Sequence, residues 1–457
     1  MIKNKTKLLK AFPDSRLLLD LADEALRFLS PENLIKNSIH LKGEKLKIEG
    51  QIFDLKNYKK IFVIGAGKAT YFMAKEINKL LKNRITEGFI NVPQAITKKL
   101  GKIIVNRAGH PFPDENGLKG TKEILKIAEK ASKHAKKTKE RVLVICLISG
   151  GGSAMLPAPI APLSLKDKVE ITKQLLKSTA TIHEINTVRK HLSAIKGGNL
   201  AAKIMPADLI ALYISDVKND DLDIIASGPT VLDKSTSSDA LNILKKYGIK
   251  NTKAEKVLEV NETPKSINNK KVKNYVIGSN TVALKHLRKF LEKKKYSVEI
   301  FPDFLEGEAK LIPKKLFEKV KNQKKPPSEK NKIYIFGGET VVKIIGKGFG
   351  GRNQELALSA IKEIPETAKL MTLATDGVDG IAPVPVAGAI ITGDLKRLCK
   401  EKNIDIEKYL KNNDSYSALK NLDCLIYTGP SGTNVGDIAV ILNQNTLAIS
   451  SKYNENK

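Results

Sequence analysis

The stretch that decides the fold is VLVICLI (142–148), which runs directly into SGGGS (149–153). An unbroken apolar run of this length is typical of a strand buried on both faces, as in a parallel sheet covered by helices. The glycines that follow let the backbone come close to a ligand. Together the two stretches predict an α/β sheet with a binding loop at the carboxyl end of a strand.

The segments around this stretch alternate in the way that βαβ units do. Expected strands are 60–64, 88–91, 103–105 and 209–214, and expected helices are 70–81, 118–134, 165–177 and 182–204. Residues 322–332 are polar and carry two prolines, which predicts a linker. Beyond it we expect strands 333–336, 340–345, 370–375 and 424–427, with a helix over 352–364.

Composition narrows the class of protein. The 457 residues fit two or three domains, and 79 Lys+Arg against 49 Asp+Glu give a net charge of +30. Basic residues are scattered and aromatic residues make up only 5%, so we predict no nucleic-acid partner, with a nucleic-acid binder kept as an alternative. Three cysteines without a CxxC pair, and no apolar run long enough for a membrane, predict a cytoplasmic protein.

Five loops follow expected strands and are rich in glycine or acidic residues: 65–68, 149–153, 215–228, 346–351 and 429–434. Backbone N–H groups in such loops can bind an anion, and a helix that follows adds favourable potential. The recurrence predicts a polyanionic ligand. The 149–153 loop lacks the spacing of a P-loop, so an ordinary P-loop kinase is excluded.

A second interpretation comes from Gly346-x-Gly348-x-x-Gly351, which matches the dinucleotide-binding fingerprint. Asp376 ends the next expected strand, where a ribose-binding acid would lie. These matches keep an NAD-dependent dehydrogenase as a rival interpretation. Against it, Arg352 directly follows the last glycine, and an arginine there suits a phosphate or carboxylate.

Several polar side chains fall where they could serve phosphate chemistry. Lys68 opens a helix beside a glycine turn, and Asp216 and Asp376 end strands, as Mg²⁺ ligands do. On the expected 182–204 helix, four polar residues lie beside the apolar stripe and predict the wall of a cleft: Asn186, Arg189, Ser193 and Lys196.

Many stretches occur in an order that covers most of the chain: GAGKA (65–69), GHPFPDENG (109–117), LISGGGSAML (147–156), EINTVRKHLSAIKGGNLA (184–201), SDV (215–217), DIIASGPT (223–230), GGETVV (337–342), GGRNQELAL (350–358), TDGVDG (375–380), AGA (387–389), NDSY (413–416) and TGPSGTNVGD (428–437). In this combination the chain resembles the class II glycerate kinases, the glycerate 2-kinase group with a C-terminal MOFRL domain.

The resemblance implies a kinase that uses ATP and Mg²⁺ to phosphorylate D-glycerate at the 2-hydroxyl, as a monomer or homodimer. It implies a doubly wound, Rossmann-like N-terminal domain (1–268), a smaller mixed α/β domain (269–457, MOFRL region about 332–445) and an active site between them. Lys68 and Arg352 match the family's basic pair. A hydroxypyruvate reductase stays as the alternative, since some members have carried that label.

We therefore predict the following site: Lys68 and Arg352 for catalysis; Gly65, Gly67, Ser149, Gly150, Gly151, Gly152 and Ser153 for ATP; Asn186, Arg189 and Lys196 for glycerate; and Asp216 and Asp376 for the metal. The chain departs from the family at 218–220 and at 381–386, where the usual acidic residue before Ala-Gly-Ala is missing.

Overall fold

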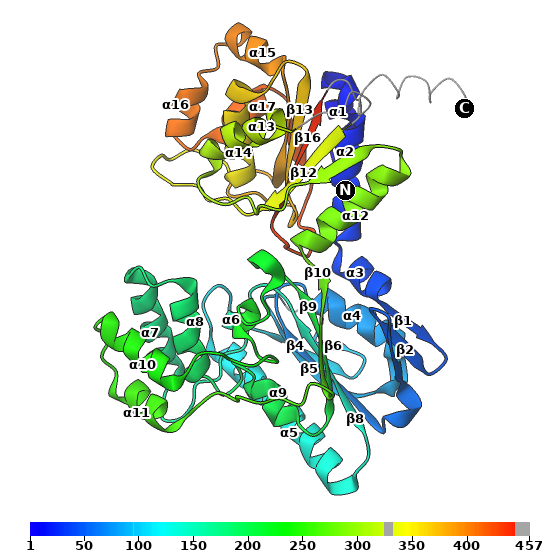
Figure 1. The fold of residues 1–457 in the computed structure, drawn as a ribbon, viewed down its shortest axis with the longest axis vertical. Coiled ribbons are helices and arrows are strands. Elements are labelled where there is room, and N and C mark those ends of the chain that lie inside the picture. Colours follow the sequence, from blue (N-terminus) through cyan, green and yellow to red (C-terminus); the bar gives the residue numbers. More distant parts are fainter. Residues whose placement is uncertain (95, 324–331, 444–457) are drawn as a thin grey trace. The chain divides into compact units, whose positions relative to one another are not determined.

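The computed structural model describes residues 1–94, 96–323 and 332–443. Most of the expected linker (324–331) and the last two residues of the expected MOFRL region (444–445) lie outside these ranges. The chain forms two compact units, one of Pro31–Ile277 and one of Met1–Ser30 with Gly278–Lys457 (Figure 1). We describe each unit by itself.

The Pro31–Ile277 unit is built on a seven-stranded sheet of order β10-β9-β8-β4-β5-β7-β6. Its strands are β4 (Lys60–Ala66), β5 (Ile85–Val92), β6 (Lys99–Leu100), β7 (Ile103–Arg107), β8 (Val142–Ile148), β9 (Asp208–Ile214) and β10 (Val272–Gly278). The central pairs β4·β5, β4·β8, β8·β9 and β5·β7 are parallel, and the short β6 pairs with β7 in antiparallel orientation. The predicted parallel sheet is confirmed.

Helices cover both faces of this sheet, which explains the unbroken apolar strands. Every residue of β8 and β9 is buried. The long helix α5 (Glu115–Thr138) packs Ile124 and Ala128 in one cluster with Phe62 of β4. The helix α4 (Thr70–Leu81) packs against β4, β5 and β8 without joining that cluster, so it covers the opposite face. The predicted doubly wound arrangement is therefore present.

A helical layer with its own apolar core is attached to this sheet. It consists of α7 (Leu165–Lys177), α8 (Ile182–His191), α10 (Ser237–Lys246) and α11 (Thr252–Val260), whose shared core includes Ile171, Ile185 and Val257. The remaining elements of the unit are α3 (Pro31–Ser38), α6 (Gly152–Met155), α9 (Asn199–Ile204) and a small sheet of β1 (Ile39–Lys42), β2 (Lys45–Ile48) and β3 (Gln51–Asp54).

The prediction of one helix over 182–204 is wrong. The helix α8 ends at His191, and α9 begins only at Asn199. Between them Gly197 and Gly198 take φ values of +57° and +84°, a left-handed conformation that a continuous α-helix does not contain. Ser193 and Lys196 therefore lie in a loop and not on the helical stripe that carries Arg189.

The other unit has a mixed sheet of order β11-β12-β16-β13-β14-β15. Its strands are β11 (Ser297–Ile300), β12 (Lys332–Gly338), β13 (Ala368–Ala374), β14 (Val386–Thr392), β15 (Leu425–Tyr427) and β16 (Asp437–Asn443). Only β11·β12 is parallel. The expected mixed α/β architecture is confirmed, but the expected strand over 340–345 is wrong, since only an isolated bridge at Val341 occurs there.

The helices of this unit include the N-terminal segment. They are α1 (Lys5–Ala11), α2 (Arg16–Phe28), α12 (Asn280–Lys293), α13 (Ile312–Lys321), α14 (Arg352–Glu363), α15 (Leu395–Glu401), α16 (Ile406–Lys411) and α17 (Ser415–Asn421). Phe28 stacks on His286 of α12 with ring centroids 3.7 Å apart, and Lys3 N–H donates to Tyr427 O at 2.7 Å. The observed division thus differs from the predicted 1–268 and 269–457, because the first thirty residues pack with the second unit.

Candidate active site

Two predicted ATP loops interlock at the carboxyl ends of the neighbouring strands β4 and β8. Ser149 N–H donates to Ala66 O at 3.2 Å, and Lys68 N–H donates to Gly150 O at 3.0 Å. Ser149 Oγ accepts from Ala69 N–H at 3.0 Å. The structure therefore brings the 65–69 and 149–153 segments together, and the Lys68 side chain is exposed beside them.

Gly65 and Gly67 serve close packing. A Cβ at Gly65 would overlap Leu147 O, and one at Gly67 would overlap Ser149 Oγ and lie 2.6 Å from Ser149 O. Gly67 also has a φ of +143°, and its N–H already donates to Asn91 O at 3.2 Å. These two glycines let the loops meet, and the N–H of Gly67 is not open to a phosphate.

The 149–153 loop is different, because it holds open backbone donors. Gly152 N–H donates to Ser149 O at 3.1 Å. The N–H groups of Gly150, Gly151 and Ser153 have no acceptor in the part of the chain that the structure describes. Successive open N–H groups beside a residue at positive φ, here Gly151 at +81°, form a concavity that suits an anion. The arrangement fits the phosphates of ATP.

One carboxylate and one imidazole lie against this loop. A Cβ at Gly150 would overlap the carboxylate of Asp216, and one at Gly151 would lie 2.9 Å from His110 Nε2. Burial, and to a smaller degree the charge of Lys68, lower the pKa of His110. The imidazole therefore favours its neutral form. The place of His110 at the loop could not be predicted from the sequence, because residues 110 and 151 are far apart in the chain.

The two residues predicted to bind the metal, Asp216 and Asp376, lie in different units. Asp216 lies beside the open donors, and Mg²⁺ commonly takes one or two carboxylates together with phosphate oxygens and water. Among the described residues no group of three or more His, Cys, Asp or Glu could hold a metal by itself. Asp376 belongs to the other unit, where its Oδ1 accepts from Val378 N–H at 3.0 Å in a turn. Of the two, Asp216 fits a metal that arrives with phosphate.

Two residues predicted to bind glycerate, Lys196 and Asn186, instead stabilise the Ser153 end of the 149–153 loop. Lys196 Nζ donates to Ser153 O at 2.9 Å, to Ser153 Oγ at 3.0 Å and to Ala226 O at 3.3 Å. Ser227 Oγ donates to Asn186 Oδ1 at 3.1 Å and lies 3.1 Å from Ser153 Oγ. Ala226 and Ser227 are non-glycine residues at φ +52° and +60°, so these bonds hold a strained turn against the loop.

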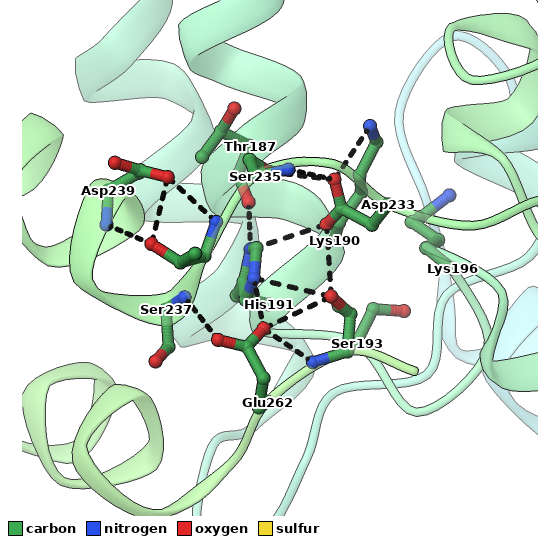
Figure 2. A network of polar contacts seen from close by, with 12 residues as sticks. Thr187, Lys190, His191, Ser193, Lys196, Asp233, Ser235, Ser237, Asp239 and Glu262 are labelled. Atoms are coloured by element: carbon green, nitrogen blue, oxygen red, sulfur yellow. Dashed lines mark hydrogen bonds and ion pairs between the residues drawn. The ribbon is translucent and has the colours of Figure 1, made fainter. Parts of the chain in front are cut away.

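A buried polar network fixes α8 behind this turn (Figure 2). His191 Nδ1 lies 2.8 Å from Thr187 O, and its Nε2 lies 2.8 Å from Glu262 Oε1. On the same helix, Lys190 Nζ is 3.3 Å from Asp233 Oδ1 and also pairs with Asp223. The side chains of Lys190 and Asp233 are only 3% and 1% exposed, so the pair ties α8 firmly to the segment after the turn.

Arg352, the second predicted catalytic residue, lies in the other unit at the start of α14. Its Nε donates to Asp437 Oδ2 at 2.6 Å, Nη2 to Asp437 Oδ1 at 3.0 Å and Nη1 to Glu339 Oε1 at 2.6 Å. Burial opposes the charge, but the pair with Asp437 outweighs it and raises the pKa of Arg352. The carboxylate of Asp379 caps the same helix by accepting from Asn353 N–H at 3.0 Å.

The 346–351 loop, which carries the dinucleotide fingerprint, has no open donors from 345 to 350. Gly346 N–H donates to Asn413 Oδ1 at 2.8 Å, Gly348 N–H to Asn412 O at 2.9 Å and Gly350 N–H to Ile381 O at 2.8 Å. The N–H groups of 345, 347 and 349 are likewise bound to Asn413, Asn412 and Asp414. A pyrophosphate would find the donors of residues 345–350 already taken, which argues against a dinucleotide-dependent reductase.

Comparisons with known proteins show which family the chain resembles. Residues 17–262 match the model of a domain of unknown function, DUF4147, and residues 332–437 match the MOFRL family. The chain is 37% identical to the D-glycerate 2-kinase of Thermotoga maritima over 93% of this chain and 97% of that protein. It is 40% identical to the glycerate 2-kinase of Pyrococcus horikoshii, over 93% and 96%. A crystal structure of a Thermotoga maritima glycerate kinase superposes with a TM-score of 0.82 at 36% identity, over 94% of this chain and 99% of that one.

Proposed function

This chain belongs to the glycerate kinase family of proteins with a DUF4147 and a MOFRL domain, and from this we propose that it transfers a phosphoryl group from ATP to the 2-hydroxyl of D-glycerate. The products are 2-phosphoglycerate and ADP. It is a phosphotransferase with an alcohol acceptor, because the group that accepts the phosphoryl is a hydroxyl. Its relatives are named D-glycerate 2-kinase and glycerate kinase.

The observation that carries the proposal is the set of open N–H groups at the tip of β8. Phosphoryl transfer requires positioning and charge stabilisation and little covalent chemistry. Gly150, Gly151 and Ser153 supply donors for phosphate oxygens, and Lys68 supplies a cation at the neighbouring strand tip. Gly65, Gly67 and Gly152 shape the loops that present these donors.

The remaining residues take supporting roles in the proposal. Asp216, with phosphate oxygens and water, would hold Mg²⁺, which when bound neutralises part of the phosphate charge. Arg352 is the second basic residue of the reaction, and its bidentate bonds to Asp437 keep its guanidinium oriented. Asn186 and Lys196 hold the loop, while Arg189 has no acceptor among the described residues and stays available to a bound anion.

A coupled assay with D-glycerate, ATP and Mg²⁺, followed by identification of the phosphoglycerate isomer, tests the proposal. We expect 2-phosphoglycerate, and we expect Lys68→Ala and Arg352→Ala each to lower kcat by about 100-fold or more. Lys122→Ala, on the exposed side of α5, is the matched control and should keep the rate of the unaltered chain. A chain that makes no phosphoglycerate, or that oxidises NAD(P)H with hydroxypyruvate, would overturn the proposal.

No helix in the described ranges is long and apolar enough to cross a membrane. A cytoplasmic location, a monomeric or homodimeric state and the lack of a nucleic-acid partner stay predictions. A salt titration against DNA would test the last of these, since binding through scattered lysines falls steeply with salt.

A further inference from the structure

A cavity of about 420 Å³ opens beside the 149–153 loop, within the same unit. The loop contributes Gly151 and Ser153 to its wall, and the rest comes from residues 110–113, from Ala154 and Pro157 after the loop, from α7 and α8, and from Lys196. No acidic side chain lines it in the part of the chain that the structure describes. A ligand there would meet the open N–H groups on one side and the basic side chains of the two helices on the other.

Lys168, on α7, is a basic residue that sequence reasoning missed. It is only 7% exposed, and among the described residues its Nζ donates one hydrogen bond, to Leu192 O at 3.4 Å. Arg189 lines the same cavity, and its guanidinium has no acceptor in the described ranges. Burial first, and the charge of Arg189 second, lower the pKa of Lys168 to about 7. Buried cations without a counter-ion are costly, so the site is suited to an anionic ligand.

The rest of the wall indicates what kind of anion fits. Phe112, Val169 and Leu176 give the cavity an apolar face, and Phe112 is 62% exposed. Glycerate cannot use such a face, because each of its three carbons carries oxygen. A nucleotide can, since its base is flat and its phosphates are anionic. A volume of about 420 Å³ also falls in the range of pockets for ligands of that size.

We propose that this cavity is the nucleotide site, in which Lys168 and Arg189 bind the phosphate chain and Phe112 stacks on the base. The inference rests on the proposed kinase function for the identity of the nucleotide. In this proposal Arg189 binds the nucleotide, whereas the sequence predicted that it binds glycerate. It also explains why Lys168 and Arg189 line the same cavity as the open 149–153 loop, because one extended polyanion can reach both.

Equilibrium binding of ADP with Mg²⁺ to the full chain, without glycerate, is the direct test. We expect Lys168→Met to raise the Kd of ADP about 10-fold or more, because a charged donor to phosphate is lost. Phe112→Ala should raise it about 5-fold or more through lost stacking. The KM for D-glycerate should stay within about twofold in both variants. Lys166→Met, exposed on the same helix and outside the cavity, is the matched control and should bind ADP normally.

The outcomes separate this inference from the proposed function. If the unaltered chain binds ADP and the variants lose it, the nucleotide site stands even when D-glycerate is not phosphorylated. If the kinase reaction occurs and both variants bind ADP normally, the inference is overturned while the function stands. A selective rise in the KM for D-glycerate would instead assign the cavity to the acceptor. Phe112 is exposed, so its variant stays informative should Lys168→Met fail to fold.

Discussion

The 149–153 loop and the 346–351 loop are both rich in glycine, yet the structure uses them in opposite ways. In the first, the N–H groups of Gly150, Gly151 and Ser153 have no acceptor among the described residues. In the second, every N–H from 345 to 350 donates to residues 381 or 412–414. The N–H groups of Gly150, Gly151 and Ser153 can therefore bind an anion and those of residues 345–350 cannot, although only the second loop matches a nucleotide-binding fingerprint.

The difference shows that glycine has two separate uses in a loop. It can leave backbone donors accessible, or it can allow another segment to pack so closely that it takes the donors. A Cβ at Gly348 would overlap Asp414 Cβ and lie 2.6 Å from its Cα, so the second loop is closed by packing. The two uses predict different consequences for the same substitution.

The largest effect is expected for Gly150→Ala in the open loop. The new Cβ would overlap the carboxylate of Asp216, so either the loop or the carboxylate must move from the phosphate site. We expect kcat/KM for glycerate phosphorylation to fall about 100-fold or more, as when a positioned donor is lost. Steady-state kinetics measure it, and a near-normal rate would show that the loop does not hold the phosphates.

Gly348→Ala in the closed loop should do the reverse. The overlap with Asp414 should lower the free energy of unfolding by about 1–3 kcal/mol, as overpacking does. Because residues 345–350 offer no open donors, kcat/KM of the folded protein should stay near normal. Urea unfolding and kinetics on the same sample test both parts, and a selective loss of activity would break the comparison.

The affinity for ADP should also depend on pH, because Lys168 of α7 lies in the cavity beside the open loop. The titratable side chains that share its cavity are His110 of the 110–113 segment, Lys173 of its own helix, Arg189 of α8 and Lys196 in the loop after α8, and none of these is acidic. The burial that lowers the pKa of Lys168 to about 7 leaves it increasingly neutral above that pH. A bound anion favours the protonated amine, so ADP affinity should fall as pH rises from 7.5 to 9.

The slope of this pH dependence has an upper limit of about tenfold per pH unit for one linked proton. Lys168→Met should flatten it, and a variant that keeps the full slope would assign the proton to another group. Stability of the ligand-free chain should change in the opposite direction over pH 7–10. The unfolded chain, with a lysine of ordinary pKa, binds a proton that the folded chain does not, so stability rises with pH.

The smallest effect is a change in hydrogen exchange that requires no substitution. The amides of Gly150, Gly151 and Ser153 should exchange quickly in the free chain and slow when ADP and Mg²⁺ are added. The amides of 346–350 should be protected in both states, because their bonds do not depend on ligand. Mass spectrometry of exchanged peptides compares the two loops within one experiment, and equal behaviour would end the distinction.

Local patterns were enough for much of the fold. The apolar run of β8 and the alternation around it predicted the parallel sheet, and the strand tips at Lys68 and 149–153 do meet. The 182–204 helix was missed because its apolar spacing continues past His191, while Gly197 and Gly198 turn the chain. Lys168 was missed because nothing in its own helix distinguishes a buried lysine from a solvated one.

The amino-acid order by itself determined where strands end and where glycines follow them, since both depend on side chains that are neighbours in the chain. Only the tertiary structure decided which of those glycine loops keeps its N–H groups open. The acceptors that close 346–351 come from positions 381 and 412–414, and the acids that hold Arg352 include Asp437. Such partners are set by packing between distant segments, and a backbone donor becomes a binding group only where that packing leaves it without an acceptor.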